Sequence, residues 1–282
     1  MTASRTVKVC GQELRVEVRP GSGTGTPLLM CSGIGISYEV FDLVVDALDP
    51  GIAIVRVDVP GVGGSPVRVW PYGFPELARL LAVLLDELGY QRVDVLGFSW
   101  GGALAQQFAV QYRGRCRRLV LICTSPGLPS IPGRPQVVGK MLTPKRFRGA
   151  DHAAGLLYAG DIGSHDDEVR RWFRDGQVGG SGLGYLYQLA AAAGWSSMPF
   201  LGLIRQPVLV MGGDADPIVP VANARILAGL IPNATLHVFN GGHVEPLAAA
   251  RDFGPVISRF LLREQPSPSC DWQCGHRVGH VR

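Results

Sequence analysis

The chain of 282 residues contains no apolar run of about 18 residues, the length that a membrane-spanning helix requires. Its beginning, MTASRTVKVCGQELRV, also lacks the continuous apolar segment of a secretory signal peptide. We therefore expect a cytoplasmic protein without a membrane span.

Neither sign of charge is in large excess, because 27 Lys and Arg residues stand against 23 Asp and Glu residues, a formal net charge of +4. The basic residues are scattered, and their one small group is short and poor in aromatic side chains: Lys140, Lys145, Arg146 and Arg148. A nucleic-acid interface requires a broader basic patch, so we expect no nucleic-acid partner.

The cysteines do not form the pattern of a disulfide framework. Four of the six lie in or beside apolar, strand-like segments: Cys10, Cys31, Cys116 and Cys123. In such segments a free thiol behaves as a small hydrophobic group, so we expect these four to be buried and reduced.

The C-terminal tail carries the other two cysteines beside two histidines, with a spacing similar to that of a zinc site: Cys270, Cys274, His276 and His280. The segment that leads into them is rich in Pro and Ser, and no apolar core surrounds them. We therefore predict a disordered tail over 265–282 and no metal site.

Apolar residues, in contrast, make up 46% of the chain, enough for a large core. Eight short apolar runs have the composition of strands: Val7–Val9, Leu14–Val18, Leu28–Cys31, Ile52–Asp58, Val93–Leu96, Leu119–Cys123, Val208–Met211 and Thr235–Phe239. The run Phe74–Leu88 places leucines on one helical face and stops at Gly89, a glycine terminator. Strands that alternate with helices predict an α/β fold with a mostly parallel eight-stranded sheet flanked by helices. The first two strands are close enough to form an antiparallel hairpin at its edge.

The alternation fails over 126–200, where Gly and Pro are dense and the apolar segments lack strand character. We interpret this region as a cap inserted between two parts of one core, 1–125 and 201–264. A cap over an active site excludes water and supplies apolar walls that select a substrate.

The segment GFSWG, from Gly97 to Gly101, lies between an apolar strand pattern and a helix pattern. Strand, sharp turn and helix around Gly-x-Ser-x-Gly form a nucleophile elbow, in which side chains at the two glycine positions would collide with neighbouring backbone. Of these five residues, the serine is the one whose side chain the turn leaves accessible to a substrate. The five letters alone are weak, but their context predicts that Ser99 is a nucleophile.

A serine hydroxyl attacks well only when an imidazole takes its proton and a carboxylate fixes the tautomer of that imidazole. In this kind of fold the order along the chain is Ser, acid, His. A buried strand leads into Asp214 and Asp216, and we favour Asp216 because the residue before a proline has an extended backbone that can aim the side chain. His243 follows the next strand after a flexible loop and is the candidate base, whereas His237 lies within that strand.

The attacked carbonyl becomes an oxyanion, which needs two preorganised backbone N–H donors. The amide of Trp100, directly after Ser99, is one. The other is expected from the loop Ser32–Gly35 after the third strand, and we assign it to Ile34.

Two glycine-rich stretches have some likeness to nucleotide-binding loops. The stretch Gly61–Ser65 lacks the third glycine that opens a helix. A second set has no strand before it and no lysine in register after it: Gly179, Gly180, Gly182 and Gly184. We interpret this second set as a hinge or plain loop, and we expect no cofactor.

Four segments taken together resemble a known family: VDVPGVGGS at 57–65, GFSWGGALAQQFA at 97–109, GGDADPIVP at 212–220 and GGH at 241–243. They are similar to the intracellular medium-chain-length poly(3-hydroxyalkanoate) depolymerases, a branch of the α/β-hydrolases. The resemblance implies an α/β-hydrolase fold with a cap, and the roles of nucleophile, acid and base for Ser99, Asp216 and His243. Related polymer synthases carry cysteine at the elbow, so the serine favours hydrolysis over polymerisation.

The expected activity is that of a serine hydrolase that cleaves aliphatic 3-hydroxyacyl ester bonds through an acyl-enzyme. Its partner would be a small-molecule or polymeric ester, and the resemblance adds a polyester granule surface. A small-molecule carboxylesterase, lactonase or thioesterase with the same triad is the alternative, and an acyltransferase is a further one. A noncatalytic ligand-binding protein on the same fold is the alternative from another class.

Overall fold

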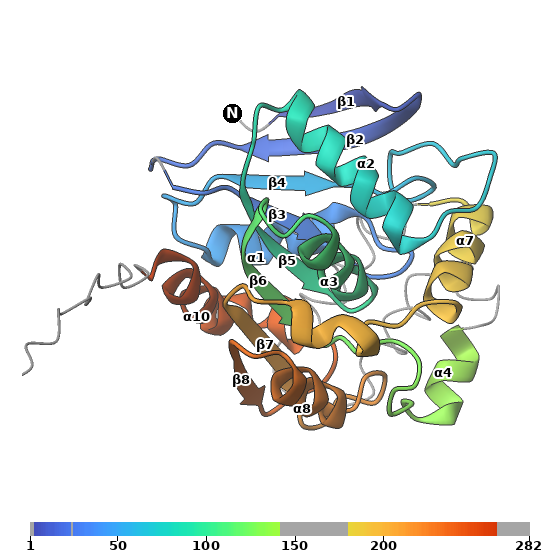
Figure 1. The fold of residues 1–282 in the computed structure, drawn as a ribbon, viewed down its shortest axis with the longest axis vertical. Coiled ribbons are helices and arrows are strands. Elements are labelled where there is room, and N and C mark those ends of the chain that lie inside the picture. Colours follow the sequence, from blue (N-terminus) through green and yellow to red (C-terminus); the bar gives the residue numbers. More distant parts are fainter. Residues whose placement is uncertain (1–2, 24, 142–179, 264–282) are drawn as a thin grey trace, which may run out of the picture.

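The computed structural model describes residues 3–23, 25–141 and 180–263, in which a central sheet carries helices on both faces (Figure 1). The sheet has eight strands in the order β1-β2-β4-β3-β5-β6-β7-β8. Their bounds are β1 Ala3–Val9, β2 Gln12–Arg19, β3 Leu28–Cys31, β4 Ile54–Val57, β5 Val93–Phe98, β6 Cys116–Ile122, β7 Val208–Gly213 and β8 Ala234–Phe239. β2 pairs antiparallel with β1 and β4, and the remaining pairs are parallel. The predicted hairpin and the mostly parallel eight-stranded sheet are confirmed.

The central strands are apolar without alternation because both of their faces are covered. Every residue of β3, β4, β5 and β7 is buried. Such continuous apolar runs are typical of parallel strands between two helical layers. The edge strand β8, in contrast, leaves several side chains partly exposed.

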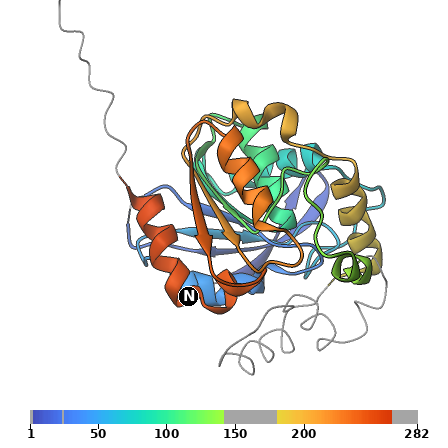
Figure 2. The same cartoon turned by 90° about the horizontal axis from the view of Figure 1, so that it is seen from below.

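Two helical layers cover the sheet, as the turned view in Figure 2 shows. The helices have these bounds: η1 Tyr38–Phe41, α1 Asp42–Ala47, α2 Phe74–Glu87, α3 Trp100–Gln111, α4 Pro135–Met141, α7 Gly182–Ala193, η3 Met198–Leu203, α8 Val221–Leu230, α9 Glu245–Ala248 and α10 Ala250–Leu262. Residues of α2, α3, α7 and α8 belong to one apolar core, and residues of α1, α9 and α10 to the other. Gly89 follows α2 with a φ of +78°, as expected of a glycine that ends a helix. None of the described helices is both long and apolar enough to cross a membrane.

The described part of the expected cap, 126–141 and 180–200, contains α4, α7 and η3 but no strand of the sheet. Gly182 and Gly184 lie in the first turn of α7, so their interpretation as hinge or plain loop is wrong. The Ser181 side chain caps this helix by accepting a hydrogen bond from the Gly184 N–H at 2.9 Å, which offsets part of the cost of the poor helix propensity of glycine. The segment 142–179, with three of the basic residues, and the tail with its Cys/His group lie outside the described residues.

Cys10 is exposed, in contrast to the prediction that it is buried. With Gly11 it forms the two-residue turn between β1 and β2, and both residues have a positive φ, of 49° and 79°. Tight hairpin turns require such angles, so the local turn places this thiol in solvent. The other three described cysteines, Cys31, Cys116 and Cys123, are free and buried as predicted.

Candidate active site

Three predicted site residues follow three strands of the sheet: Ser99 follows β5, Asp216 follows β7, and His243 follows β8. These strands are parallel, so their carboxyl ends lie at the same edge of the sheet. Residues far apart in the sequence are thereby brought to one place.

The turn at Ser99 is strained, with φ of 53° and ψ of −118°. The neighbouring backbone explains both glycines of the motif. A Cβ at Gly97 would lie 2.4 Å from the carbonyl oxygen of Gly101, and a Cβ at Gly101 would lie 2.1 Å from that of Cys31. Side chains at these positions would push the first turn of α3 away from β5 and β3, so the sharp turn that presents Ser99 would open.

Ser99, His243 and Asp216 form one hydrogen-bonded chain. His243 Nε2 lies 3.0 Å from Ser99 Oγ, and His243 Nδ1 lies 2.7 Å from Asp216 Oδ2. The imidazole and the carboxylate are both buried. When Nδ1 donates to the carboxylate, Nε2 can accept the serine proton, which is the arrangement that general-base catalysis requires.

The second oxygen of Asp216 is held by its own loop, because Oδ1 accepts hydrogen bonds from the N–H groups of Ile218 and Val219, both at 2.8 Å. Asp214 is exposed and accepts from the Gly241 N–H at 3.1 Å, so it stabilises the turn instead. Of the two carboxylates that the sequence offered, Asp216 is the one that contacts His243.

The buried thiol of Cys123 lies beside the Asp216–His243 pair. The sequence pattern alone did not connect this residue with the site. Cys123 Sγ lies within 4.8 Å of ligand atoms of Asp216 and His243. Burial, together with the nearby Asp216 carboxylate, raises the pKa of Cys123 well above its ordinary value. A neutral thiol is a poor nucleophile, so Cys123 does not compete with Ser99.

The loop after β3, which carries Ile34, packs directly against the elbow. A Cβ at Gly101 would meet the carbonyl oxygen of Ser32 at 2.5 Å, and one at Gly33 would touch the Phe98 ring at 3.3 Å. The Ser32 hydroxyl donates to the Ile36 carbonyl at 2.8 Å and closes the loop. The two predicted oxyanion donors therefore lie on abutting segments, and their catalytic role stays a prediction.

Ser99 opens into a cavity of about 200 Å³. Its apolar wall contains Phe74, Trp100, Leu128, Ala192, Trp195 and Val219, and hydroxyl groups come from Ser99, Thr124, Ser125 and Ser130. None of the described residues that line it carries a charged side chain. A larger hollow of about 450 Å³ beside the β1–β2 hairpin is lined by none of the predicted site residues.

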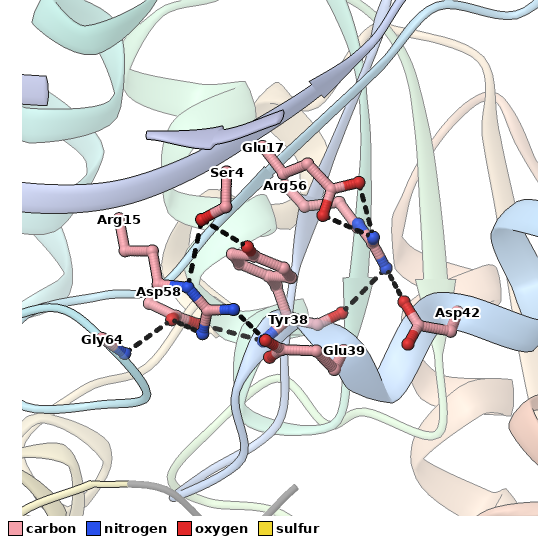
Figure 3. Close-up of polar contacts among 9 residues, drawn as sticks. All are labelled: Ser4, Arg15, Glu17, Tyr38, Glu39, Asp42, Arg56, Asp58 and Gly64. Atoms are coloured by element: carbon pink, nitrogen blue, oxygen red, sulfur yellow. Dashed lines mark hydrogen bonds and ion pairs between the residues drawn. The ribbon is translucent and has the colours of Figure 1, made fainter. Parts of the chain in front are cut away.

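A network of ion pairs surrounds Tyr38, a residue that follows the β3 loop in the sequence (Figure 3). Arg15 pairs with Glu39 and Asp58, and Arg56 pairs with Glu17 and Asp42. The two guanidinium groups stack on the Tyr38 ring, at 4.3 and 4.9 Å from its centre. The network joins β2 and β4 to η1, the helix that continues the β3 loop.

Asp58 is the buried centre of this network. Its carboxylate accepts from the N–H groups of Tyr38 at 2.9 Å and Gly64 at 3.0 Å, and from Arg15 at 3.1 Å. It therefore connects the segment after the β3 loop with the stretch Gly61–Ser65. Burial raises the pKa of Asp58 to about 6, against the opposing effect of these donors.

Comparisons with known proteins show the family to which this fold belongs. A family model described as alpha/beta hydrolase fold matches residues 26–165 and 177–246. A poly(3-hydroxyalkanoate) depolymerase of Ectopseudomonas oleovorans is 43% identical to this chain, over 93% of each of the two. A second relative, from Burkholderia vietnamiensis, is a 2-hydroxy-6-oxononadienedioate/2-hydroxy-6-oxononatrienedioate hydrolase. It is 30% identical over 90% of this chain and 93% of its own. The structure of an enol-lactonase from Burkholderia xenovorans matches with a TM-score of 0.82 at 23% identity, over 92% of this chain and all of its own. The chain therefore belongs to the α/β-hydrolase fold family.

Proposed function

We propose that the protein is a serine hydrolase that cleaves aliphatic 3-hydroxyacyl ester bonds, in polyester chains or their oligomers. The observation that carries this proposal is the Ser99–His243–Asp216 hydrogen-bonded chain, whose serine lines a largely apolar cavity with no charged side chain among the described lining residues. The depolymerase that is 43% identical supports the polyester as substrate. By the same argument we propose a cytoplasmic protein that acts at polyester granules, with 126–200 as the cap over the core 1–125 and 201–264.

In the proposed mechanism Ser99 attacks the ester carbonyl while His243 accepts its proton. Backbone N–H groups of Ile34 and Trp100 stabilise the oxyanion. His243 then donates its proton to the leaving hydroxyl, and an acyl-enzyme remains on Ser99. Water attacks this ester with His243 again as base, and the bond between the acyl group and Ser99 Oγ breaks as His243 returns the proton to that oxygen and the hydroxy acid leaves. Asp216 stays ionised throughout and stabilises the imidazolium.

The lining of the cavity favours a neutral acyl chain over a charged one. The hydrolase of Burkholderia vietnamiensis is named for dienedioate and trienedioate substrates, which are dicarboxylates. A free carboxylate that enters an apolar pocket without a cationic partner loses its hydration, and this costs several kcal/mol. The described wall around Ser99 offers hydroxyl groups and aromatic rings but no cation, as suits an aliphatic hydroxyacyl chain.

A small-molecule esterase or lactonase is the second candidate, and the size of the cavity favours it. About 200 Å³ is below the usual range for ligand pockets of roughly 300–1,000 Å³, so a short acyl group would fill it.

The test compares the wild-type protein with Ser99→Ala on medium-chain 3-hydroxyacyl oligomers, a monomeric alkyl ester and a dicarboxylate half-ester. We expect the substitution to lower kcat by roughly 10⁴-fold or more, and the oligomer to give the highest kcat/KM. Undiminished turnover in Ser99→Ala rejects the mechanism. A preference for the monomeric ester with no oligomer cleavage favours the second candidate.

A further inference from the structure

Helix α7 of the expected cap lies directly on the loop that carries Ile34. The side chain of Gln188 is 1% exposed, and its Oε1 accepts a hydrogen bond from the Gly35 N–H at 2.7 Å. This contact joins positions 153 residues apart in the sequence. A buried amide whose oxygen binds one backbone N–H of a loop restricts that loop more than apolar packing does.

The Gly35 N–H belongs to the peptide plane that follows Ile34. A hydrogen bond that holds this plane restricts the ψ angle of Ile34 and so limits the directions that its backbone can take. Gly35 has a φ of +65°, and a Cβ there would lie 2.7 Å from the Tyr185 ring, so only glycine leaves room for α7. The start of the loop is held by the close approach of Gly101 to the carbonyl oxygen of Ser32, which a Cβ on Gly101 would meet at 2.5 Å.

The same residue of α7 also contacts the elbow. The indole Nε1 of Trp100 donates to the main-chain oxygen of Gln188 at 2.9 Å. Gln188 thus binds both segments that carry the proposed oxyanion donors, one through its side chain and the other through its backbone.

We propose that Gln188 is a positioning residue that couples the placement of α7 to the geometry of the oxyanion hole. The inference rests on the proposed function. With α7 seated, the Gly35 peptide is locked and the Ile34 N–H is held toward the reacting carbonyl. With the Gln188 acceptor removed, the loop samples other orientations and the transition state loses stabilisation, while binding of the neutral acyl chain is unaffected.

The experiment compares the wild-type chain with Gln188→Met, which keeps the length of the side chain but removes the acceptor. We expect kcat for ester hydrolysis to fall about tenfold to a hundredfold while KM changes less than about twofold. Labelling of Ser99 by a small alkyl fluorophosphonate should slow by a similar factor, because its phosphoryl oxygen occupies the oxyanion position and no natural substrate is required. Leu186→Ala, on the exposed face of the same helix, is the matched control and should leave both rates unchanged.

Thermal melting identifies the folded variants. If Gln188→Met does not fold, Gln188→Asn decides by the same criteria, since it withdraws the acceptor by one methylene. A folded variant with wild-type kcat and labelling rate, or with a change in KM alone, overturns the inference and leaves the proposed function intact. A wild-type protein that neither hydrolyses esters nor labels at Ser99 contradicts the proposed function and this inference with it.

Discussion

Asp214 and Asp216 have the same side chain and the same loop, yet their surroundings give them different tasks. Asp216 is buried, with one oxygen toward His243 and the other bound by two backbone N–H groups. Asp214 is exposed and caps a turn through Gly241. An acceptor with two backbone donors on one oxygen cannot rotate freely, so the orientation of the Asp216 carboxylate is set before any substrate binds.

At this scale the informative pair of substitutions is Asp216→Asn and Asp214→Asn. In Asp216→Asn the amide oxygen keeps the two backbone donors, so the NH₂ group faces His243 and forces the tautomer whose Nε2 carries the proton. We expect kcat to fall about 10⁴-fold, because that nitrogen can no longer accept the serine proton. Asp214→Asn should stay within about twofold of wild type, since its amide oxygen still accepts from Gly241. Steady-state kinetics on one ester checks both, and equal losses would contradict the assignment of the acid.

Among the elements, α10 and α8 cover opposite faces of the sheet and show how closely helices approach their neighbours. A Cβ at Gly254 in α10 would lie 2.4 Å from the carbonyl oxygen of Ala47 in α1. At Gly229 in α8 a Cβ would meet no atom within 4 Å. Gly254 permits the close contact between α10 and α1, whereas at Gly229 there is room for a larger side chain.

We therefore expect alanine to have opposite effects at these two positions. Gly254→Ala should lower the free energy of unfolding by about 1–3 kcal/mol, because the backbone of α1 must move to admit the methyl group. Gly229→Ala should raise it by up to about 1 kcal/mol, because alanine has the higher helix propensity. Urea unfolding followed by circular dichroism measures both. A Gly254→Ala variant as stable as the wild type would show that the α10–α1 contact does not limit stability.

For the whole molecule, the network around the buried Asp58 links the antiparallel edge of the sheet to the segment after the β3 loop and to the stretch Gly61–Ser65 (Figure 3). Burial raises the pKa of this carboxyl to about 6 from an ordinary value of 3.8. Between these two pH values the folded protein binds more protons at Asp58 than the unfolded chain does. The contribution of this group to stability therefore falls as pH rises through that window and is constant above it.

Asp58→Asn isolates this contribution. The free energy of unfolding of the wild-type chain, minus that of the variant, should decrease by about 2 kcal/mol between about pH 4 and pH 7, since each pKa unit corresponds to about 1.4 kcal/mol. Denaturant unfolding at a series of pH values provides both curves. A difference that rises with pH would mean that Arg15 and the backbone donors outweigh desolvation.

The local sequence pattern was sufficient to predict the strands and the helix that position the site. The buried strand before Ser99, the glycines around it and the helix after it are neighbours in the chain, so their side chains carry the signal directly. The same holds for the strands before Asp216 and His243, whose order along the chain is confirmed as strands β7 and β8.

The sequence by itself determined the mostly parallel sheet and the candidate nucleophile, acid and base, because apolar periodicity and turn chemistry are local properties of the chain. Only the tertiary structure decided which residues touch across long separations. The contact of Asp216 with His243, the hydrogen bond from Gly35 to Gln188, the thiol of Cys123 behind the site and the charges around Asp58 all depend on it. These contacts have no sequence signature, because they form between segments that meet only when the sheet and its two helical layers pack.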